Sequence, residues 1–435
     1  MFIITDFGAK GDGQTINTAS IQQAIDTCSQ SGGGTVIVPA GLFITGTLWL
    51  RDNIELHLCN GATLRGSSNL EDYNRDDAFP QNMRSEQEQW NGAHLLLGVE
   101  VSNVTISGPG CIDGNCEAFF EPVPKPRKPS FGWSHGMLVA KDKERLRPGQ
   151  MIMFSECRDI RLHDLDLRNS CCWTCLFHGC QDVFVSGLKI RNPIDGGNTD
   201  GIDIDCCRRV IVRDCNIRTG DDGITLRGSF RTLKDKSGIC EDVAITNCII
   251  DTSVCAFRIG VGEGCIRNAA ISNIVITRAC TGFLLQSAYS AIAPRGVDIS
   301  EIAISNIQAR NLAYPVRIIS GYPTATAQIS QIRINGFYGQ CHANCELRGN
   351  EQTRPHDIRL SNFDLTVVPS PIVLESAEDY PKYFLELDRV DAVTLDNFNL
   401  RWQEQNPAWQ GALRQGDTSA VLIRPNCTLN DPPSR

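Results

Sequence analysis

The 435-residue sequence has no run of about eighteen apolar residues, so no segment of it is expected to span a membrane as a helix. It also lacks a dense run of Lys or Arg, and its formal net charge of −9 disfavours nucleic acid as a partner. Its first residues show no basic region, no long apolar stretch and no small-residue cleavage site. We therefore expect a cytoplasmic protein with no membrane or nucleic-acid partner, and the sequence leaves the oligomeric state unknown.

The chain contains 20 cysteines, but it is large and shows no export signal, so we expect reduced thiols and not a disulfide framework. Four of them recur at one place in successive repeats: Cys157, Cys180, Cys207 and Cys240. A small buried thiol at that place would fill a narrow core. The close cysteine pairs at 172/175 and 341/345 lack a second half at metal-ligand spacing. We therefore predict no metal and no cofactor.

A strand-turn-strand pattern repeats along the chain at intervals of 23 to 35 residues. Its copies begin at Ile160, Val183, Val210, Val243, Ala269, Ile302, Ile332, Ile358 and Val393, with looser copies near Ile54 and Val104. Each copy has two short stretches of alternating apolar and polar residues, separated by a two-residue step. The interval is too short for a crossover helix, so each copy predicts one coil whose strands pair in parallel with the next, about 4.8 Å away. The sequence thus predicts an all-β protein, a parallel β-helix that forms a single domain over residues 1–435.

Two regions depart from the repeat. In residues 20–30 the apolar residues Ile21, Ala24, Ile25 and Cys28 have helical spacing, which predicts an amphipathic helix that caps the first coil. Residues 72–150 are irregular and contain four prolines between positions 122 and 129. We interpret this range as a loop insertion beside the β-helix, placed over a cleft, and not as a separate domain.

Two acidic motifs lie one coil apart: Asn-Thr-Asp-Gly at 198–201 and Gly-Asp-Asp-Gly at 220–223. If each repeat is one coil, Asp200 stacks close to Asp221 and Asp222. Crowding of like charges raises at least one carboxyl pKa and leaves a proton donor beside ionised neighbours, which suits hydrolysis of a sugar linkage. The alternative is that these aspartates only form turns, since both motifs end in Gly.

These motifs resemble those of glycoside hydrolase family 28, the polygalacturonase family. Residues 6–13 (Asp-Phe-Gly-Ala-Lys-Gly-Asp-Gly) are similar to the entry signature of pectin-lyase-like β-helix proteins, and residues 168–170 and 173–174 also fit the family pattern. The resemblance runs from about residue 4 to about residue 310. It implies a single-stranded right-handed parallel β-helix and an inverting hydrolase. In that reaction Asp221 is the general acid, and Asp200 and Asp222 hold and activate water, with about 6.5–9.5 Å between the members of an inverting pair.

The sequence also departs from the family. Val254 stands where the family has a histidine, and residues 281–286 contain no cation to grip a substrate carboxylate. A substrate other than plain polygalacturonate is therefore expected. We predict that Asp203, Arg227, Arg258 and His178 face outward beside the acids and that, with Asn198, they bind substrate. The alternatives are surface ion pairs of the arginines with Asp203 and Asp205, and a solvated surface histidine.

We therefore predict an inverting glycosidase that acts on oligosaccharides from pectin or related glycans containing uronate or deoxysugar units. An insertion that walls off one end of the cleft favours exo-action. One alternative is a β-helix lyase or epimerase acting on uronates, with Ca²⁺ held by Asp203 and Asp205 and with Arg258 as the base. The other alternative is a glycan-binding β-helix without catalytic activity.

Overall fold

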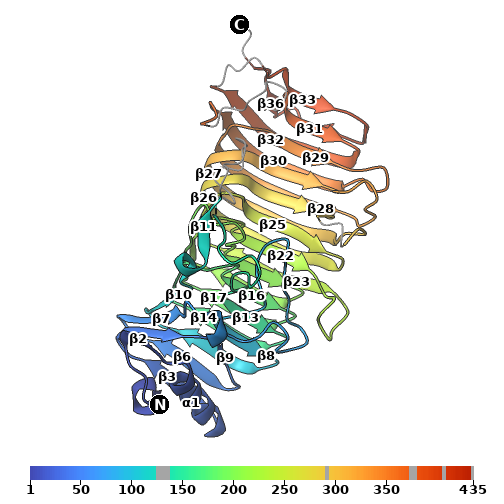
Figure 1. Cartoon of the computed structure of the whole chain (residues 1–435). Coiled ribbons are helices and arrows are strands. Elements are labelled where there is room, and N and C mark those ends of the chain that lie inside the picture. The colour runs from blue at the N-terminus through green and yellow to red at the C-terminus, as the bar shows by residue number, and fades with distance from the viewer. Residues whose placement is uncertain (124–137, 290–292, 372–379, 404–407, 433–435) are drawn as a thin grey trace. The chain divides into compact units, whose positions relative to one another are not determined.

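The computed structural model describes residues 1–123, 138–289, 293–371, 380–403 and 408–432. Contacts between Cα atoms divide it into two compact units (Figure 1). The first unit holds the described residues up to Asp221 together with 231–236; the second holds 222–230 and the described residues from Ser237 onward. That residues 1–435 form a single domain stays a prediction. Within the described ranges, no helix is both long and apolar enough to cross a membrane.

Strands of the first unit pair in parallel in three ladders, as the repeat predicts. The first ladder contains β1 (Phe2–Ile3), β3 (Gly34–Val38), β6 (Ile54–Leu58), β9 (Ser102–Ser107), β14 (Arg158–His163), β17 (Gln181–Ser186) and β20 (Arg208–Arg213). The second contains β2 (Asp12–Ile16), β4 (Gly41–Thr45), β7 (Ala62–Gly66), β10 (Cys111–Asp113), β15 (Asp166–Arg168), β18 (Lys189–Arg191) and β21 (Asn216–Thr219). The third contains β5 (Leu48–Trp49), β8 (Leu96–Val99), β13 (Ile152–Ser155), β16 (Cys175–His178) and β19 (Ile202–Asp205).

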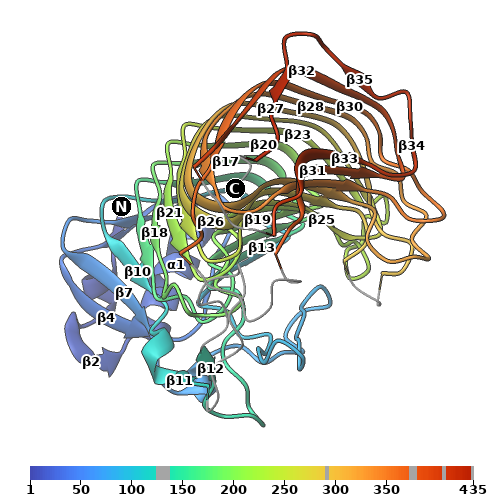
Figure 2. The same cartoon turned by 90° about the horizontal axis from the view of Figure 1, so that it is seen from above.

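The second unit is also a stack of parallel strands. One ladder joins β22 (Ile224–Gly228), β25 (Cys255–Gly262), β29 (Cys345–Arg348), β31 (Tyr383–Asp388) and β33 (Gly411–Gln415) through the ends of β26 (Cys265–Gln286) and β27 (Asp298–Ile319). The remaining strands pair along the long ones: β23 (Ile239–Thr246), β24 (Ile249–Thr252), β28 (Ser330–Cys341), β30 (His356–Val367), β32 (Val390–Trp402), β34 (Thr418–Ser419), β35 (Leu422–Ile423) and β36 (Thr428–Leu429). In Figure 2, β28, β30 and β32 follow the same curved path in successive coils. The predicted fold, a single-stranded right-handed parallel β-helix, is confirmed.

The two-residue step in each repeat is a turn with a left-handed residue. Positive φ angles of 51° to 63° occur there at Asp164, Asp214, Asn247, Asn273, Asn306, Asn362 and Asn397. Asn and Asp tolerate this conformation better than other residues with a side chain, because their short polar groups bond locally. Side-chain amides also bond along the stack, with Asn397 Nδ2 2.7 Å from Asn362 Oδ1. The step therefore redirects the chain from one ladder to the next.

The core is filled by residues stacked in register. Cys157, Cys180 and Cys207 are buried in three successive coils of the first unit. Each thiol donates to two backbone carbonyls, one of them from the preceding coil, at 3.2–3.4 Å from Gly98, Phe154 and Phe177. Phenylalanines stack similarly in the second unit, where the ring centroids of Phe363 and Phe398 lie 4.7 Å apart. The recurring cysteine position of the sequence is therefore a core position, as predicted for these three.

Outside the ladders, the first unit has one α-helix and several short elements. Helix α1 (Thr18–Gln30) buries Ile21, Ala24, Ile25 and Cys28 and packs against β1, β3 and β5, where the sequence predicts a helix. The other elements are η1 (Ile4–Phe7), η2 (Leu70–Asp72), η3 (Cys116–Ala118) and the antiparallel pair β11 (Phe120–Pro122) and β12 (Leu138–Ala140). The irregular range predicted at 72–150 is too broad, because β8, β9 and β10 lie inside it and belong to the ladders.

Candidate functional site

Residues 67–95 of the first unit pack on the outer face of the third ladder, and residues 138–151 are hydrogen-bonded to them; we call these two segments the cover. Phe79 and Trp90 from the cover pack with Trp173 against an outward column formed by Leu97, Met153 and Leu176. The Trp90 and Trp173 ring centroids are 5.7 Å apart. This aromatic layer excludes water from the outer face of the ladder.

The next residue in that column is Asp203, which pairs in register with Leu176, and His178 pairs with Asp205. Strand alternation directs these polar side chains outward, opposite the buried Ile202 and Ile204. However, Asp203 and His178 are both 0% exposed. The alternative of a solvated surface histidine is therefore wrong for His178, because alternation fixes the face of a strand on which a side chain lies and not its access to water.

The acid pair of the first unit is formed by Asp200 and Asp221. One carboxylate oxygen of each lies within 4.8 Å of the other, and the residues are 2% and 7% exposed. This spacing of the nearest oxygens suits one water molecule that donates a hydrogen bond of about 2.7 Å to each of them. The two aspartates therefore lie close together, as the coil spacing predicts.

Residues between the acids lock the two coils together. The Thr199 hydroxyl donates to Gly196 O at 2.7 Å and accepts from Gly220 N at 3.0 Å. A Cβ atom at Gly220 would lie 2.2 Å from Gly196 O, so a side chain is excluded there. Asn198, in a left-handed conformation with φ 55°, donates its backbone N–H to Asp221 Oδ2 at 2.9 Å. The motifs therefore do more than form turns, since they fix the orientation of the Asp221 carboxylate.

In the second unit, Asp222 directly follows Asp221 in the chain and is 2% exposed. Cys255 N donates to its Oδ1 at 3.1 Å, and Arg258 Nε donates to its Oδ2 in an ion pair. The Tyr289 ring lies over the Arg258 guanidinium at 4.7 Å. Burial alone would lower the Arg258 pKa, but the charges of Asp222 and the Cys255 thiol raise it well above its ordinary value. Arg258 thus compensates the charge of a candidate catalytic acid.

Arg227 and Arg258 are 9% and 8% exposed, so both of these predicted substrate-binding residues are largely buried. Leu284 lies in the segment where the family pattern has a cation. It pairs in register with Arg258 on the preceding strand of the ladder and with Arg317 on the following strand. Arg317 forms an ion pair with Glu346 at 2.7 Å, and the Tyr314 ring lies 4.9 Å from it. Sequence reasoning missed Arg317, although the repeat register alone would have placed it in this column.

His94 joins the two segments of the cover. Its Nδ1 lies 2.9 Å from Gln150 O, and its Nε2 lies 2.9 Å from Asn82 Oδ1. Two oxygen neighbours favour the charged ring, but burial outweighs them and lowers the His94 pKa to about 4. The folded protein therefore holds this histidine neutral.

Since unfolded His94 titrates near 6.5, the unfolded state binds more protons between pH 6.5 and 4. We expect this residue to remove about 3 kcal/mol from the free energy of unfolding as the pH falls through that window, at 1.36 kcal/mol per pKa unit. Urea unfolding at several pH values would measure it, with His94→Gln as the comparison. An equal pH dependence in the parent and the variant would contradict the assignment.

Comparison with known proteins gives the family. The model of the glycosyl hydrolases family 28 matches residues 28–371, which begins later and ends further along than the resemblance seen in the sequence. The exo-poly-alpha-D-galacturonosidase of Dickeya chrysanthemi is 28% identical over 351 residues, 73% of this chain and 56% of that protein. A probable polygalacturonase of Vitis vinifera is 27% identical over 257 residues, 58% of this chain and 48% of that protein. The chain thus spans about half the length of these two relatives.

A solved structure, the family 28 exopolygalacturonase of Yersinia enterocolitica, superposes with a TM-score of 0.68 at 18% identity, covering 98% of this chain and 78% of that one. At this identity the likeness shows the fold alone. The family match, which covers more than half of the sequence, carries the assignment. The chain is therefore a member of glycosyl hydrolases family 28.

Proposed function

We propose that this protein hydrolyses glycosidic bonds in oligosaccharides from pectin or related glycans with uronate or deoxysugar units, with inversion at the anomeric carbon. The proposal rests mainly on the buried acid pair Asp200 and Asp221, whose carboxylate oxygens lie within 4.8 Å in a chain of this family. Crowded carboxyl groups away from water share protons, so one member can donate a proton while the other accepts one.

In the proposed reaction, Asp221 protonates the glycosidic oxygen as the bond to the anomeric carbon breaks. Asp200 takes a proton from a water molecule whose oxygen attacks the opposite face of the sugar, and the share of Asp222 in this step remains a prediction. The N–H of Asn198 donates to Asp221 Oδ2 and so fixes the orientation of this carboxyl group. Arg258 holds Asp222 in place. The roles of Asp203, Arg227, His178 and Asn198 in binding substrate remain predictions.

Action from a chain end is supported by the names of one curated relative and one solved structure, both of exo-acting enzymes. The absence of a cation at residues 281–286 supports a substrate other than plain polygalacturonate. A cytoplasmic location, expected for an enzyme of small oligomers, also stays a prediction.

The test is product analysis on defined oligosaccharides, followed by ¹H NMR of the first product formed. We expect a product of inverted configuration, no unsaturated product that absorbs in the ultraviolet, and no loss of rate with a chelator. An absorbing product that disappears with chelator would instead indicate a lyase that uses a cation. A product of retained configuration would overturn inversion.

A further inference from the structure

Arg147 is a buried arginine on the cover, 3% exposed. Its Nη2 donates to Asn198 Oδ1 at 3.1 Å and to Glu88 O at 2.9 Å, and its Nη1 donates to Cys171 O. The Phe120 ring lies 5.0 Å from its guanidinium carbon. Among the residues that the structure describes, no carboxylate forms an ion pair with it. A buried guanidinium that bonds only neutral acceptors keeps its full positive charge, and such a charge is costly to bury.

The positive charge of Arg147 lies near the acid pair of the first unit. Burial raises the pKa of the Cys172 thiol. The charge of Arg147 lowers this pKa and the charge of Asp200 raises it, so both charges lie near the same thiol. Two hydrogen bonds connect Arg147 to the acid: the guanidinium donates to the Asn198 side chain, and the Asn198 backbone N–H donates to Asp221 Oδ2. A left-handed backbone at Asn198 is sparsely populated without support, and the bond to Arg147 supplies that support.

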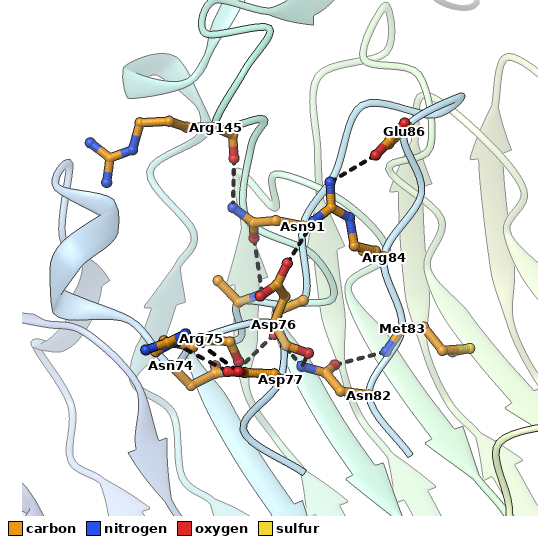
Figure 3. Close-up of polar contacts among 12 residues, drawn as sticks. Asn74, Arg75, Asp76, Asp77, Asn82, Met83, Arg84, Glu86, Asn91 and Arg145 are labelled. Carbon is orange, nitrogen blue, oxygen red and sulfur yellow. Dashed lines mark hydrogen bonds and ion pairs between the residues drawn. The ribbon is translucent and has the colours of Figure 1, made fainter. Parts of the chain in front are cut away.

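The two segments of the cover hold Arg147 in place. Asn91 N donates to Arg147 O at 2.9 Å. Asn91 Nδ2 donates to Arg145 O at 3.0 Å, and Figure 3 shows this second contact. Arg145 lies on the outer side, in a hollow of about 440 Å³, where it pairs with Glu71 at 2.6 Å. Arg145 and Arg147 are thus two residues apart. Glu71 compensates the charge of Arg145 at the surface, whereas the charge of Arg147 is directed inward.

We propose that Arg147 is a positioning residue for the general acid, acting through Asn198 to orient the Asp221 carboxylate. This inference rests on the proposed function of Asp221. A fixed orientation of the Asp221 carboxyl group suits proton transfer to the glycosidic oxygen, and the nearby positive charge favours the ionised form of neighbouring carboxyl groups.

The experiment compares Arg147→Gln, Arg147→Lys and the surface control Arg145→Gln. We expect Arg147→Gln to lower kcat by about 10- to 100-fold, the effect of a misplaced catalytic group, with little change in KM. Loss of the positive charge should also move the pH–rate profile toward higher pH. Arg147→Lys should restore the profile because it keeps the charge, and Arg145→Gln should match the parent.

A second measurement does not depend on turnover. Titration of ¹³C-labelled aspartate carboxyl groups by NMR should show an upward pKa shift in the acid pair of Arg147→Gln and not in Arg145→Gln. Absence of both the kinetic and the NMR shift, in a variant with parental circular dichroism, would overturn the proposal. If the parent shows no glycosidase activity while the NMR shift is present, the proposed function fails and the coupling of Arg147 to the acids stands.

Discussion

Replacement of Asp221 by Asn is expected to lower kcat on a natural oligosaccharide by about 10²- to 10⁴-fold, the usual contribution of general acid catalysis. The amide can still accept the N–H of Asn198, which bonds Oδ2 at 2.9 Å, so folding should be nearly unchanged. Without a donated proton, the leaving sugar must depart as an alkoxide. Steady-state kinetics with circular dichroism of the variant would measure both effects.

A change of leaving group makes this prediction specific. An aryl glycoside with an acidic phenol needs little protonation, so Asp221→Asn should lose far less activity on it than on the natural linkage. Asp113→Asn is a matched control, because Asp113 is also buried in the first unit and bonds Arg168 and Asn169. Parental turnover by Asp221→Asn, or an equal loss in Asp113→Asn, would contradict the role of Asp221 as acid.

The fold could be predicted from the sequence because the β-helix repeats one local pattern. Alternation within each copy shows which side chains enter the core, and the two-residue step marks the turn, as the left-handed Asp164 and Asn247 demonstrate. The register of the copies predicted the stacked thiols of Cys157 and Cys180. Each of these inferences needs only residues within one coil or in its neighbour, where spacing along the chain becomes spacing along the stack.

The acid pair was predictable for the same reason, but its surroundings were not. Asp203 and His178 lie at outward positions of their strands and are nevertheless buried. The cover that packs on Leu176, the neighbour of Asp203 in the same column, comes from segments without repeat periodicity. Arg147 reaches Asn198 from such a segment, so no register could have located it. The aromatic residues Phe79 and Trp90 were the available signal, since large apolar side chains in an irregular segment need a surface on which to pack.

Replacement of Arg258 by Met is expected to lower the free energy of unfolding by about 3–5 kcal/mol, the usual result of removing one partner of a buried ion pair. The side chains of Arg258 and Asp222 are 10% and 3% exposed, so water cannot replace the lost guanidinium. The rate of hydrolysis should also fall, because Asp222 would lose the contact that holds its Oδ2. Urea unfolding and kinetics on the same sample would measure the two losses.

The double variant Asp222→Asn/Arg258→Met separates the two effects. It removes both charges, so we expect it to recover much of the stability and none of the activity, since the candidate base is gone. Arg317→Met is the matched control in the same ladder: its pair with Glu346 has 29% and 12% exposed side chains, so the loss of stability should be smaller. Recovery of activity together with stability would show that Asp222 serves only the fold, which would leave Asp200 and Asp221 as the whole of the catalytic machinery.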